Sequence, residues 1–181
     1  MPNFNLSDEE ALKQVQRGEV EAFEVIVERY QEKLLRYGRK FLNRNEDIEE
    51  IVQEIFVKAY VNAKGYDTSR KFSSWIYRIA HNEFVNALKK KKPLYFFDLD
   101  ILLPRFVAKK NLEEETFRKE DREKISSLMD KLEFKYKEPL ILHYFEDLSY
   151  KDISDILRIP VSTVGIRIKR AKEAIKKMYN I

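Results

Sequence analysis

The chain has 181 residues, of which 44% are hydrophobic and 36% are charged, so it can bury a core in one domain or in two small ones. It contains no cysteine, which excludes disulfides, thiolate metal sites and cysteine nucleophiles. No apolar run reaches membrane-spanning length, and the first ten residues, MPNFNLSDEE, turn acidic where a signal peptide needs an apolar run. We therefore expect a cytoplasmic protein.

The charge is unevenly distributed along the chain. Residues 113–155 hold 8 Lys and Arg against 13 Asp and Glu, a net charge of −5. Residues 158–181 hold 7 Lys and Arg against 1 Glu, a net charge of +6. A positive segment directly after a negative one indicates an anionic partner at the C-terminal end.

The first half of the chain is predicted to be helical. Ser7 followed by Glu10 is a capping-box pattern, and Gly18 is a plausible stop for the first helix. Apolar residues at spacings of three or four predict three more helices, at about 23–41, 46–60 and 73–92, with a loop at 63–72. The third of these four helices is expected to keep Tyr60 on its buried side.

Residues 93–112 are predicted to be a linker, because Pro93 ends the fourth helix. The segment LYFFDLDILLPRFV is apolar, whereas linkers are usually polar. A second helical run follows, with PLILHYF as a short buried helix and a C-terminal pair of helices. The sequence therefore predicts an all-α fold with two small helical domains, 1–92 and 113–181, joined by the linker 93–112.

The C-terminal pair has the pattern of a helix-turn-helix. Ser149 and Asp152 form a cap signal, the sequence RIP breaks the first helix, and the second begins near Val161. An apolar stripe along the second helix faces its partners. The remaining faces carry hydroxyls, cations and one exposed aliphatic side chain, which are the candidate DNA contacts: Ser162, Thr163, Ile166, Arg167, Lys169 and Arg170. A basic, solvated helix end remains the alternative, since cations also complement the helix dipole.

The third helix carries an acidic face. Asp47, Glu50 and Glu54 are spaced i, i+3, i+7 with Gln53 beside them, and no basic residue occurs from Glu46 to Glu54. These carboxylates could be a divalent-metal site, although such a site usually needs ligands from several elements. A solvated acidic face is the simpler interpretation.

The fourth helix carries candidate base contacts. Asn82 and Asn86 lie one turn apart, flanked by Arg78 and Lys89, and an amide can donate to and accept from base edges. Exposed asparagines are also ordinary in a helix. The KKKK run at 89–92 is either a phosphate-binding patch or a solvated helix end, and the two histidines, His81 and His143, are expected to be packing or surface residues and not ligands.

Three stretches of the chain resemble a known family. LSYKDISDILRIPVSTVGIRIKRAKEAI resembles region four of the extracytoplasmic-function (ECF) sigma factors, which are bacterial transcription initiation factors of the sigma-70 superfamily. EDIEEIVQEIFVKAY resembles the core-polymerase motif of their region two, and FSSWIYRIAHNEFVNALKKKK resembles their promoter-melting helix. The resemblance leaves out only the linker.

The resemblance implies a regulator with no enzymatic activity, cofactor, metal or small-molecule substrate. Its implied partners are promoter DNA and core RNA polymerase, which it would contact at the clamp coiled coil and the flap. A further implied partner is an anti-sigma factor, which in this family is often membrane-bound.

The resemblance also assigns roles to the candidate residues. Asp47, Glu50, Gln53 and Glu54 would dock on the clamp, and the candidate DNA contacts of the second domain would bind the upstream (minus thirty-five) element. The downstream (minus ten) element would be bound and opened by Arg78, Asn82, Asn86 and Lys89, together with a loop that captures an unstacked base with Tyr66, Arg70 and Lys71.

Three positions depart from the family pattern. Arg158 stands where a glycine is usual, so it is expected to be forced towards a left-handed conformation. Gly165 stands where a cation is usual, and Ile166 stands where a small hydroxyl is usual. Since an exposed Ile166 can contact a thymine methyl, we expect an altered DNA sequence preference.

Two other classes of protein and three roles for the linker stay open. A stand-alone helix-turn-helix repressor would need a dimer or ligand domain, and a metal-dependent nuclease or recombinase would need converging carboxylates or a nucleophile. The linker could pack on a helical domain, bind an anti-sigma partner, or form a short amphipathic helix over its own domain.

Overall fold

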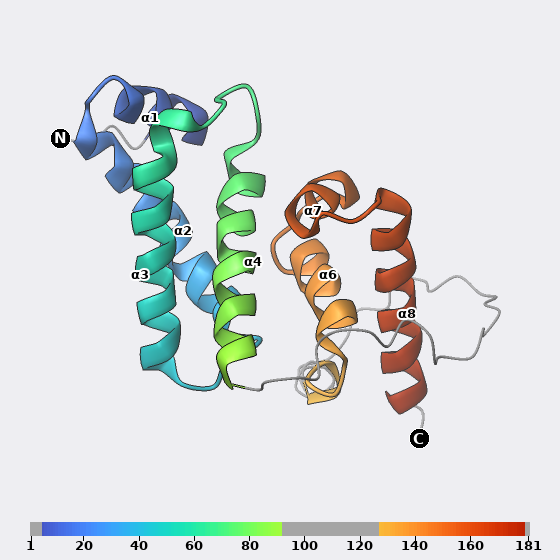
Figure 1. Cartoon of the computed structure of the whole chain (residues 1–181). Helices are drawn as coiled ribbons and strands as arrows, with labels where there is room; N and C mark the ends of the chain where they lie inside the picture. Colours follow the sequence, from blue (N-terminus) through green and yellow to red (C-terminus); the bar gives the residue numbers. More distant parts are fainter. Residues whose placement is uncertain (1–4, 92–126, 180–181) are drawn as a thin grey trace.

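The computed structural model describes residues 5–91 and 127–179, and every regular element within these ranges is a helix (Figure 1). The predicted all-α fold is thereby confirmed. The predicted linker, 93–112, lies outside the described residues.

The N-terminal half is a helical bundle. Its elements are α1 (Asp8–Gln16), η1 (Val20–Ala22), α2 (Phe23–Arg39), α3 (Asn45–Asn62), η2 (Ala63–Gly65) and α4 (Phe72–Lys91). The predicted capping box of Ser7 and Glu10 is present, and Gly18, with φ +100°, ends α1. The three long helices α2, α3 and α4 run side by side, with α1 across one end (Figure 1).

A close helix crossing explains the glycine in α2. A Cβ atom on Gly38 would lie 2.6 Å from Phe84 Cζ and 2.7 Å from Ile48 Cγ2. Phe84 belongs to α4 and Ile48 to α3, and both side chains are buried. Gly38 therefore lets the α2 backbone approach both neighbouring helices.

The described part of the C-terminal half includes α6 (Phe134–Tyr144), α7 (Tyr150–Leu157) and α8 (Val161–Tyr179). α6 begins one turn earlier than predicted, because the Glu133 carbonyl already accepts hydrogen bonds from the backbone N–H groups of Tyr136 and Lys137. Pro139 therefore lies inside the helix, where its missing N–H costs one backbone hydrogen bond. Burial of the following Leu140, Ile141 and Leu142 offsets this cost.

The predicted helix-turn-helix is confirmed as α7, a tight turn and α8. Ser149 accepts from the backbone N–H of Asp152, and the Asp152 side chain accepts from the Ser149 N–H, which completes a capping box. At the other end of α7, Arg158 has φ 55° and ψ 44°, the left-handed conformation expected from the missing glycine. α8 packs on α6 and α7 through Val164, Ile168 and Ala171.

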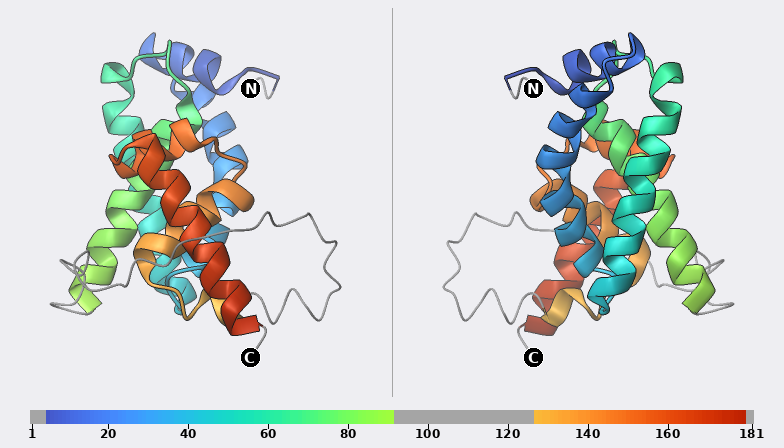
Figure 2. Two further views of the ribbon diagram at one scale, coloured as in Figure 1. Left: turned by 90° about the vertical axis from the view of Figure 1, so that its right-hand side faces the viewer. Right: turned by 90° about the vertical axis from the view of Figure 1, so that its left-hand side faces the viewer.

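The two helical halves contact each other directly. α7 lies against α4, and the views in Figures 1 and 2 place α6, α7 and α8 along the α4 side of the first bundle. This contact positions the residues that the sequence identified as candidate DNA contacts.

Replacing Arg158 with glycine should stabilise the protein. A non-glycine residue in the left-handed region costs about 1 kcal/mol or more, and glycine removes that cost. We expect Arg158→Gly to raise the free energy of unfolding by about 0.5–1 kcal/mol after its larger chain entropy in the unfolded state is subtracted.

Urea denaturation followed by circular dichroism measures this change. Arg158→Ala is the matched control, since it removes the same side chain and keeps the backbone penalty. Equal stability of the two variants would show that φ is not the source of the effect.

Candidate nucleic-acid and polymerase interfaces

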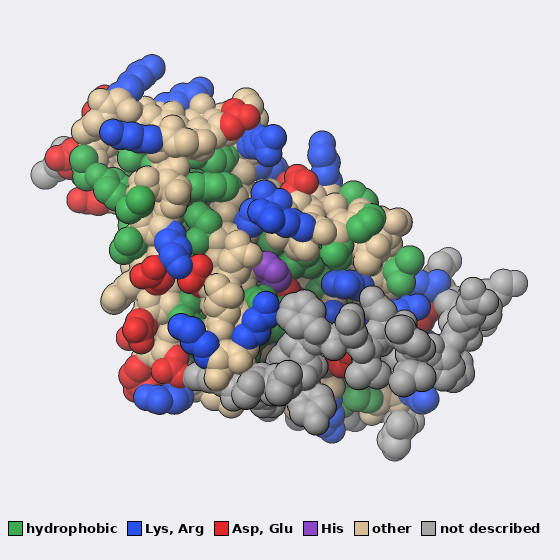
Figure 3. Space-filling model, viewed as in Figure 1, with side chains coloured by type: hydrophobic (Ala, Val, Ile, Leu, Met, Phe, Trp, Pro, Cys, Tyr) green, Lys and Arg blue, Asp and Glu red, His purple; other side chains and the backbone are tan. Residues whose placement is uncertain are grey.

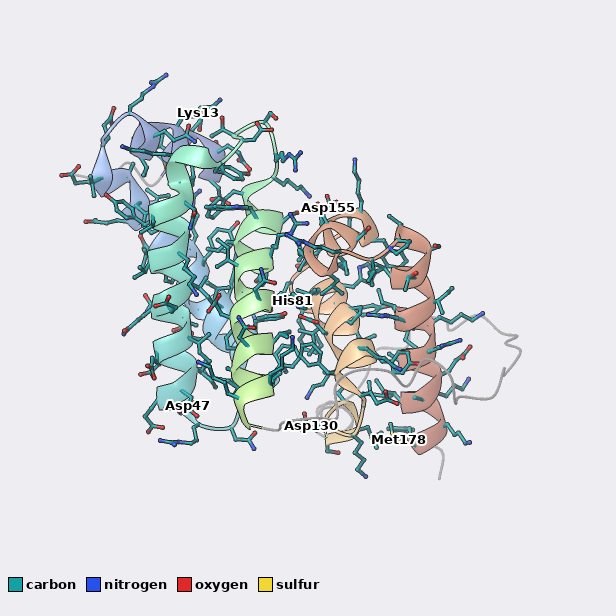
Figure 4. All side chains as sticks on the ribbon, in the orientation of Figure 1. Lys13, Asp47, His81, Asp130, Asp155 and Met178 are labelled. Carbon is teal, nitrogen blue, oxygen red and sulfur yellow. The ribbon has the colours of Figure 1, made fainter. Side chains whose placement is uncertain are left out.

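The contact between α4 and α7 uses residues predicted to bind DNA. Lys71 Nζ lies 3.1 Å from Asp152 Oδ2, and Ser74 Oγ lies 3.1 Å from Asp152 Oδ1. One turn further along α4, Arg78 donates to the backbone carbonyl of Asp155 at 2.5 Å; Figure 4 labels Asp155 on α7. Lys71 and Arg78 therefore already hold oxygen acceptors supplied by the other half of the chain.

Asp152 has two functions in this contact. Its carboxylate caps α7 through Ser149 and also accepts from Lys71 and Ser74 on the first bundle. Burial alone would raise the pKa of Asp152, but the hydrogen bonds from Ser149, Lys71 and Ser74 together outweigh burial and lower it. The carboxylate is therefore held in its charged form at neutral pH.

Arg78 is incompletely satisfied in this arrangement. Among the described residues its Nε is buried without a hydrogen-bond acceptor, although its Nη2 reaches the Asp155 carbonyl. A buried guanidinium N–H without a partner carries a desolvation cost.

A buried carboxylate joins three helices below this contact. Glu138 of α6 is 2% exposed, and its Oε1 accepts from the Tyr37 hydroxyl of α2 at 2.6 Å. His81 of α4 lies 2.6 Å from the same oxygen through Nδ1 (Figure 4). Burial, followed by the charge of Glu138, raises the pKa of Tyr37 well above its usual range, so its hydroxyl remains a donor.

A second carboxylate strengthens the same boundary. Glu146, which follows α6, accepts from the Tyr77 hydroxyl of α4 and from Arg36 Nη2 of α2 at 3.0 Å. The cation of Lys40 also stacks over the Phe145 ring, with 4.5 Å from Nζ to the centroid. At this boundary, carboxylates of the C-terminal half therefore pair with hydrogen-bond donors of the N-terminal half, and these pairs define one relative orientation of the two halves.

The face of α4 next to Arg78 is exposed. Asn82 and Asn86 are exposed, and at helical spacing they share a face with Trp75 and Ile79. We call these four residues the open face of α4. Lys89 is also exposed, near the C-terminal end of the same helix. Some of the predicted downstream-element residues are thus in contact with α7, and others lie on the adjoining exposed face of α4.

A surface pocket adjoins the open face. Its volume is about 280 Å³, and it is lined by Asn62, Gly65, Tyr66, Trp75 and Ile79. Tyr66 forms a wall of this pocket. It is 7% exposed, its hydroxyl donates to the Arg70 carbonyl at 2.5 Å, and its ring centroid lies 4.6 Å from that of Trp75.

Trp75 is a further candidate, which the sequence analysis did not include among the base contacts. It is half-buried and shares both the pocket and the open face, so it can offer a ring face to a base. The i, i+4, i+7 spacing of Trp75, Ile79 and Asn82 is the sequence pattern that could have placed Trp75 on the same face as Asn82.

In the loop before α4, Arg70 is exposed and forms an ion pair with Asp67 at 3.5 Å.

The candidate DNA contacts of α8 lie on its outer surface. Ser162, Ile166, Lys169 and Arg170 are exposed, and Thr163 and Arg167 are half-buried at the flanks. Arg170 is 3.5 Å from the Tyr136 hydroxyl, a long contact. This face of α8 is therefore accessible while α4 and α7 are in contact.

The outer face of α3 has an acidic half and an apolar half. Glu50, Gln53 and Glu54 are exposed near its middle, and Asp47 is half-buried beside Arg44, 3.9 Å away. The acidic side chains gather along the lower part of α3 in Figure 3, with Asp47 labelled near the lower end of the helix in Figure 4.

The apolar half was missed by the sequence analysis. Val57 is 55% exposed and Val61 is 69% exposed, and both continue the face of Glu50 and Glu54 at helical spacing. Tyr60 was expected to be buried, but it is 40% exposed, because its ring only reaches the core edge-on, 5.3 Å from the Phe23 centroid. The hydrophobic side chains lie over the upper part of α3 in Figure 3.

The histidines and acidic residues do not gather into a metal site in residues 5–91 and 127–179. His81 contacts Glu138, and His143 Nδ1 lies 2.9 Å from the Leu148 carbonyl. In the same ranges no helix has the length and apolar character to cross a membrane.

A basic helix-turn-helix beside a second helical bundle defines a DNA-binding transcription factor, and the acidic face of α3 suits a protein partner. Residues 26–93 match the family Sigma-70 region 2, and residues 122–175 match Sigma-70, region 4. The ECF RNA polymerase sigma factor SigW of Bacillus subtilis is 37% identical over 174 residues, covering 92% of this chain and 93% of SigW. The ECF RNA polymerase sigma-E factor of Escherichia coli is 30% identical over 179 residues, covering 94% of this chain and 93% of sigma-E.

Solved structures share the fold. CnrH in complex with the cytosolic domain of CnrY has a TM-score of 0.72 and 22% identity, covering 96% of this chain and 97% of CnrH. The sigma factor RpoE in complex with the anti-sigma factor NepR from Bartonella quintana has a TM-score of 0.66 and 19% identity, covering 88% of this chain and 97% of RpoE.

The chain therefore belongs to the ECF sigma factors of the sigma-70 family. Proteins of this class are initiation factors that bind core RNA polymerase and direct it to promoters, and they are not enzymes.

Removing the Glu138 carboxylate should separate the two halves of the free chain. Glu138→Ala leaves the Tyr37 hydroxyl and His81 Nδ1 without an acceptor, at a cost of about 1–3 kcal/mol each. We expect the open population to rise about tenfold or more in Förster transfer between dyes at Gln31→Cys and Glu173→Cys. Labelling is specific because the chain has no cysteine of its own.

Glu133→Ala is the matched control, since Glu133 is an exposed acid at the start of the same helix and makes no side-chain cap. A folded Glu138→Ala protein with unchanged transfer would contradict the role assigned to this carboxylate.

Proposed function

We propose that this sigma factor docks on core polymerase through the outer face of α3, binds the upstream element with α8, and opens the downstream element with α4. The observation that carries this proposal is the division of α4 into an open face and a side covered by α7. Family membership supports both the polymerase and the promoter as partners, and it also supports a cytoplasmic location and an anti-sigma partner.

The docking step rests on the composition of α3. Glu50, Gln53 and Glu54 favour a basic partner surface and would steer its approach, as complementary charges do. Val57 and Val61, next to them on the same face, supply apolar area that becomes buried on contact. A basic helix with an apolar edge, such as one helix of the polymerase clamp coiled coil, is complementary to both the acidic half and the apolar half of this α3 face.

The melting step rests on the open face of α4. Asn82 and Asn86 can donate to and accept from base edges, and the pocket at Trp75 and Tyr66 can receive a base that has left the stack. Extrusion of a base costs a few kcal/mol, which stacking on Trp75 and phosphate contacts by Arg70 would offset.

The covered side of α4 implies that the chain opens on the polymerase. To contact a phosphate, Arg78 Nη2 has to exchange the Asp155 carbonyl for it. The Lys71 side chain is 65% exposed, and Asp152 competes with a phosphate for its ammonium group. Arg78 gains from this exchange, because a phosphate presents several acceptors and one of its own N–H groups is without any among the described residues. The free chain is therefore a poor binder of the downstream element, and the polymerase holds the domains apart.

Reversing the charge of α3 should slow docking. We expect Glu50→Lys with Glu54→Lys to lower the association rate with core polymerase about tenfold at low ionic strength, and less at high ionic strength, because steering is screened by salt. Surface plasmon resonance at several salt concentrations measures this rate. Glu32→Lys, an exposed acid on α2, is the matched control and should have little effect.

Removing the two amide side chains of α4 should impair opening of the promoter DNA without affecting core polymerase binding. We expect Asn82→Ala with Asn86→Ala to lower the yield of open complex about tenfold or more, while core binding is unchanged. Permanganate footprinting measures the opened thymines, and Asn43→Ala, an exposed asparagine outside α4, is the control. An equal loss of core binding would show instead that the variant is misfolded.

Run-off transcription from pooled genomic fragments tests the whole proposal and the repressor alternative together. Core polymerase should produce new discrete transcripts only when this protein is added, from promoters that share an upstream and a downstream motif. Specific DNA retention by the protein alone, with a silent polymerase, would favour a helix-turn-helix repressor. Magnesium-dependent cutting lost in Glu50→Ala would favour a nuclease.

A further inference from the structure

One aliphatic side chain lies at the centre of the DNA-contact face of α8. Ile166 is 51% exposed and points away from the buried stripe of Val164, Ile168 and Ala171. A single exposed isoleucine on a protein surface needs no explanation by itself. Its position on this helix is what carries information.

The residues around Ile166 are all polar. On a helix the neighbours of residue 166 are residues 162, 163, 169 and 170, which are two hydroxyls towards the N-terminus and two cations towards the C-terminus. Hydroxyls and cations can bind phosphates or base edges, but an isoleucine can do neither. Ile166 therefore needs an apolar surface on the DNA.

The position of Ile166 along the helix places it among bases. It is the sixth residue of α8, and the N-terminal part of the second helix of a helix-turn-helix contacts base edges in the major groove. The apolar group that a base pair presents in this groove is the C5 methyl of thymine. Against a polar edge, Ile166 would displace water from donors and acceptors and return no hydrogen bond.

The neighbouring glycine favours a close approach. Gly165 presents no side chain, and the nearest atom to a Cβ built there would be a ring carbon of Tyr150 at 3.5 Å, an ordinary contact distance. A larger residue would therefore fit, so packing does not explain the glycine. Its absence of a side chain lets a base edge approach the α8 backbone beside Ile166.

We propose that Ile166 is a specificity-determining residue, which selects a thymine in the upstream element through contact with its C5 methyl. This inference rests on the proposed role of α8 in upstream-element binding. It assigns to one side chain a base preference that the surrounding hydroxyls and cations do not supply.

The first stage of the test finds the thymine. The full chain with core polymerase transcribes a promoter library in which the upstream element is random, and the transcripts are sequenced. We expect one thymine position to be enriched by the wild-type chain and by Ile166→Val, which keeps a branched apolar side chain. The enrichment should disappear with Ile166→Ser.

The second stage removes the methyl group alone. Deoxyuridine replaces that thymine in the selected element, and transcription is measured with each protein. Since one buried methyl-sized group contributes about 0.8 kcal/mol, we expect a loss of about three- to fivefold for the wild type. Ile166→Ala should respond to the replacement less than twofold.

Arg170→Ala serves as the contrast within the same face. It should weaken transcription from the thymine and deoxyuridine templates by the same factor, because a phosphate contact does not sense the methyl. Thermal unfolding of each variant shows that the fold is retained.

Two results would overturn the inference, and they are distinguishable. In the first, an upstream motif is enriched, but replacing thymine with deoxyuridine lowers transcription by the same factor for the wild type and for Ile166→Ala. Ile166 then does not contact the methyl group, and the proposed role of α8 is retained. If no upstream motif is enriched although transcription is promoter-specific, the proposed role of α8 fails and the inference fails with it.

Discussion

The arrangement of this chain depends on one buried carboxylate. Glu138 is withdrawn from water between three helices, and the Tyr37 hydroxyl and His81 Nδ1 approach the same oxygen of it. A buried charge is tolerated only when its partners are in place, so the helices that supply them are held together. Because Tyr37 and His81 belong to the first bundle and Glu138 to the second group of helices, this local requirement fixes how the two halves meet.

At the same boundary, oxygen acceptors of the protein contact two cations that are proposed to bind DNA. Asp152 and the Asp155 carbonyl occupy Lys71 and Arg78, while the outer faces of α8 and α3 remain exposed. The outer faces of α3 and α8 are thus accessible while α4 and α7 are still in contact. Under the roles proposed for these faces, the polymerase and the upstream element would be engaged before the downstream element.

The local structure followed from the sequence because local rules determine it. The capping boxes at Ser7 and Ser149, and the left-handed Arg158, each depend on a few adjacent residues. The contact of α4 with α7 could not be predicted, since the sequence places Lys71 in a loop and Arg78 on a helix but does not show which acceptor each of them meets. Tyr60 was wrongly predicted to be buried because its spacing continues the apolar stripe of α3, and the exposed Val57 and Val61 lie off that stripe and were assigned no role.

The Lys71–Asp152 ion pair has a consequence for experiments at different ionic strengths. Added salt weakens the attraction between a cation and DNA phosphates, and it also weakens the ion pair that competes for the same cation. For a chain that must exchange one anion for the other, these two effects oppose each other. The salt dependence of promoter binding should then be shallower than a count of the basic residues on α4 indicates, so a shallow slope does not mean that few phosphates are contacted.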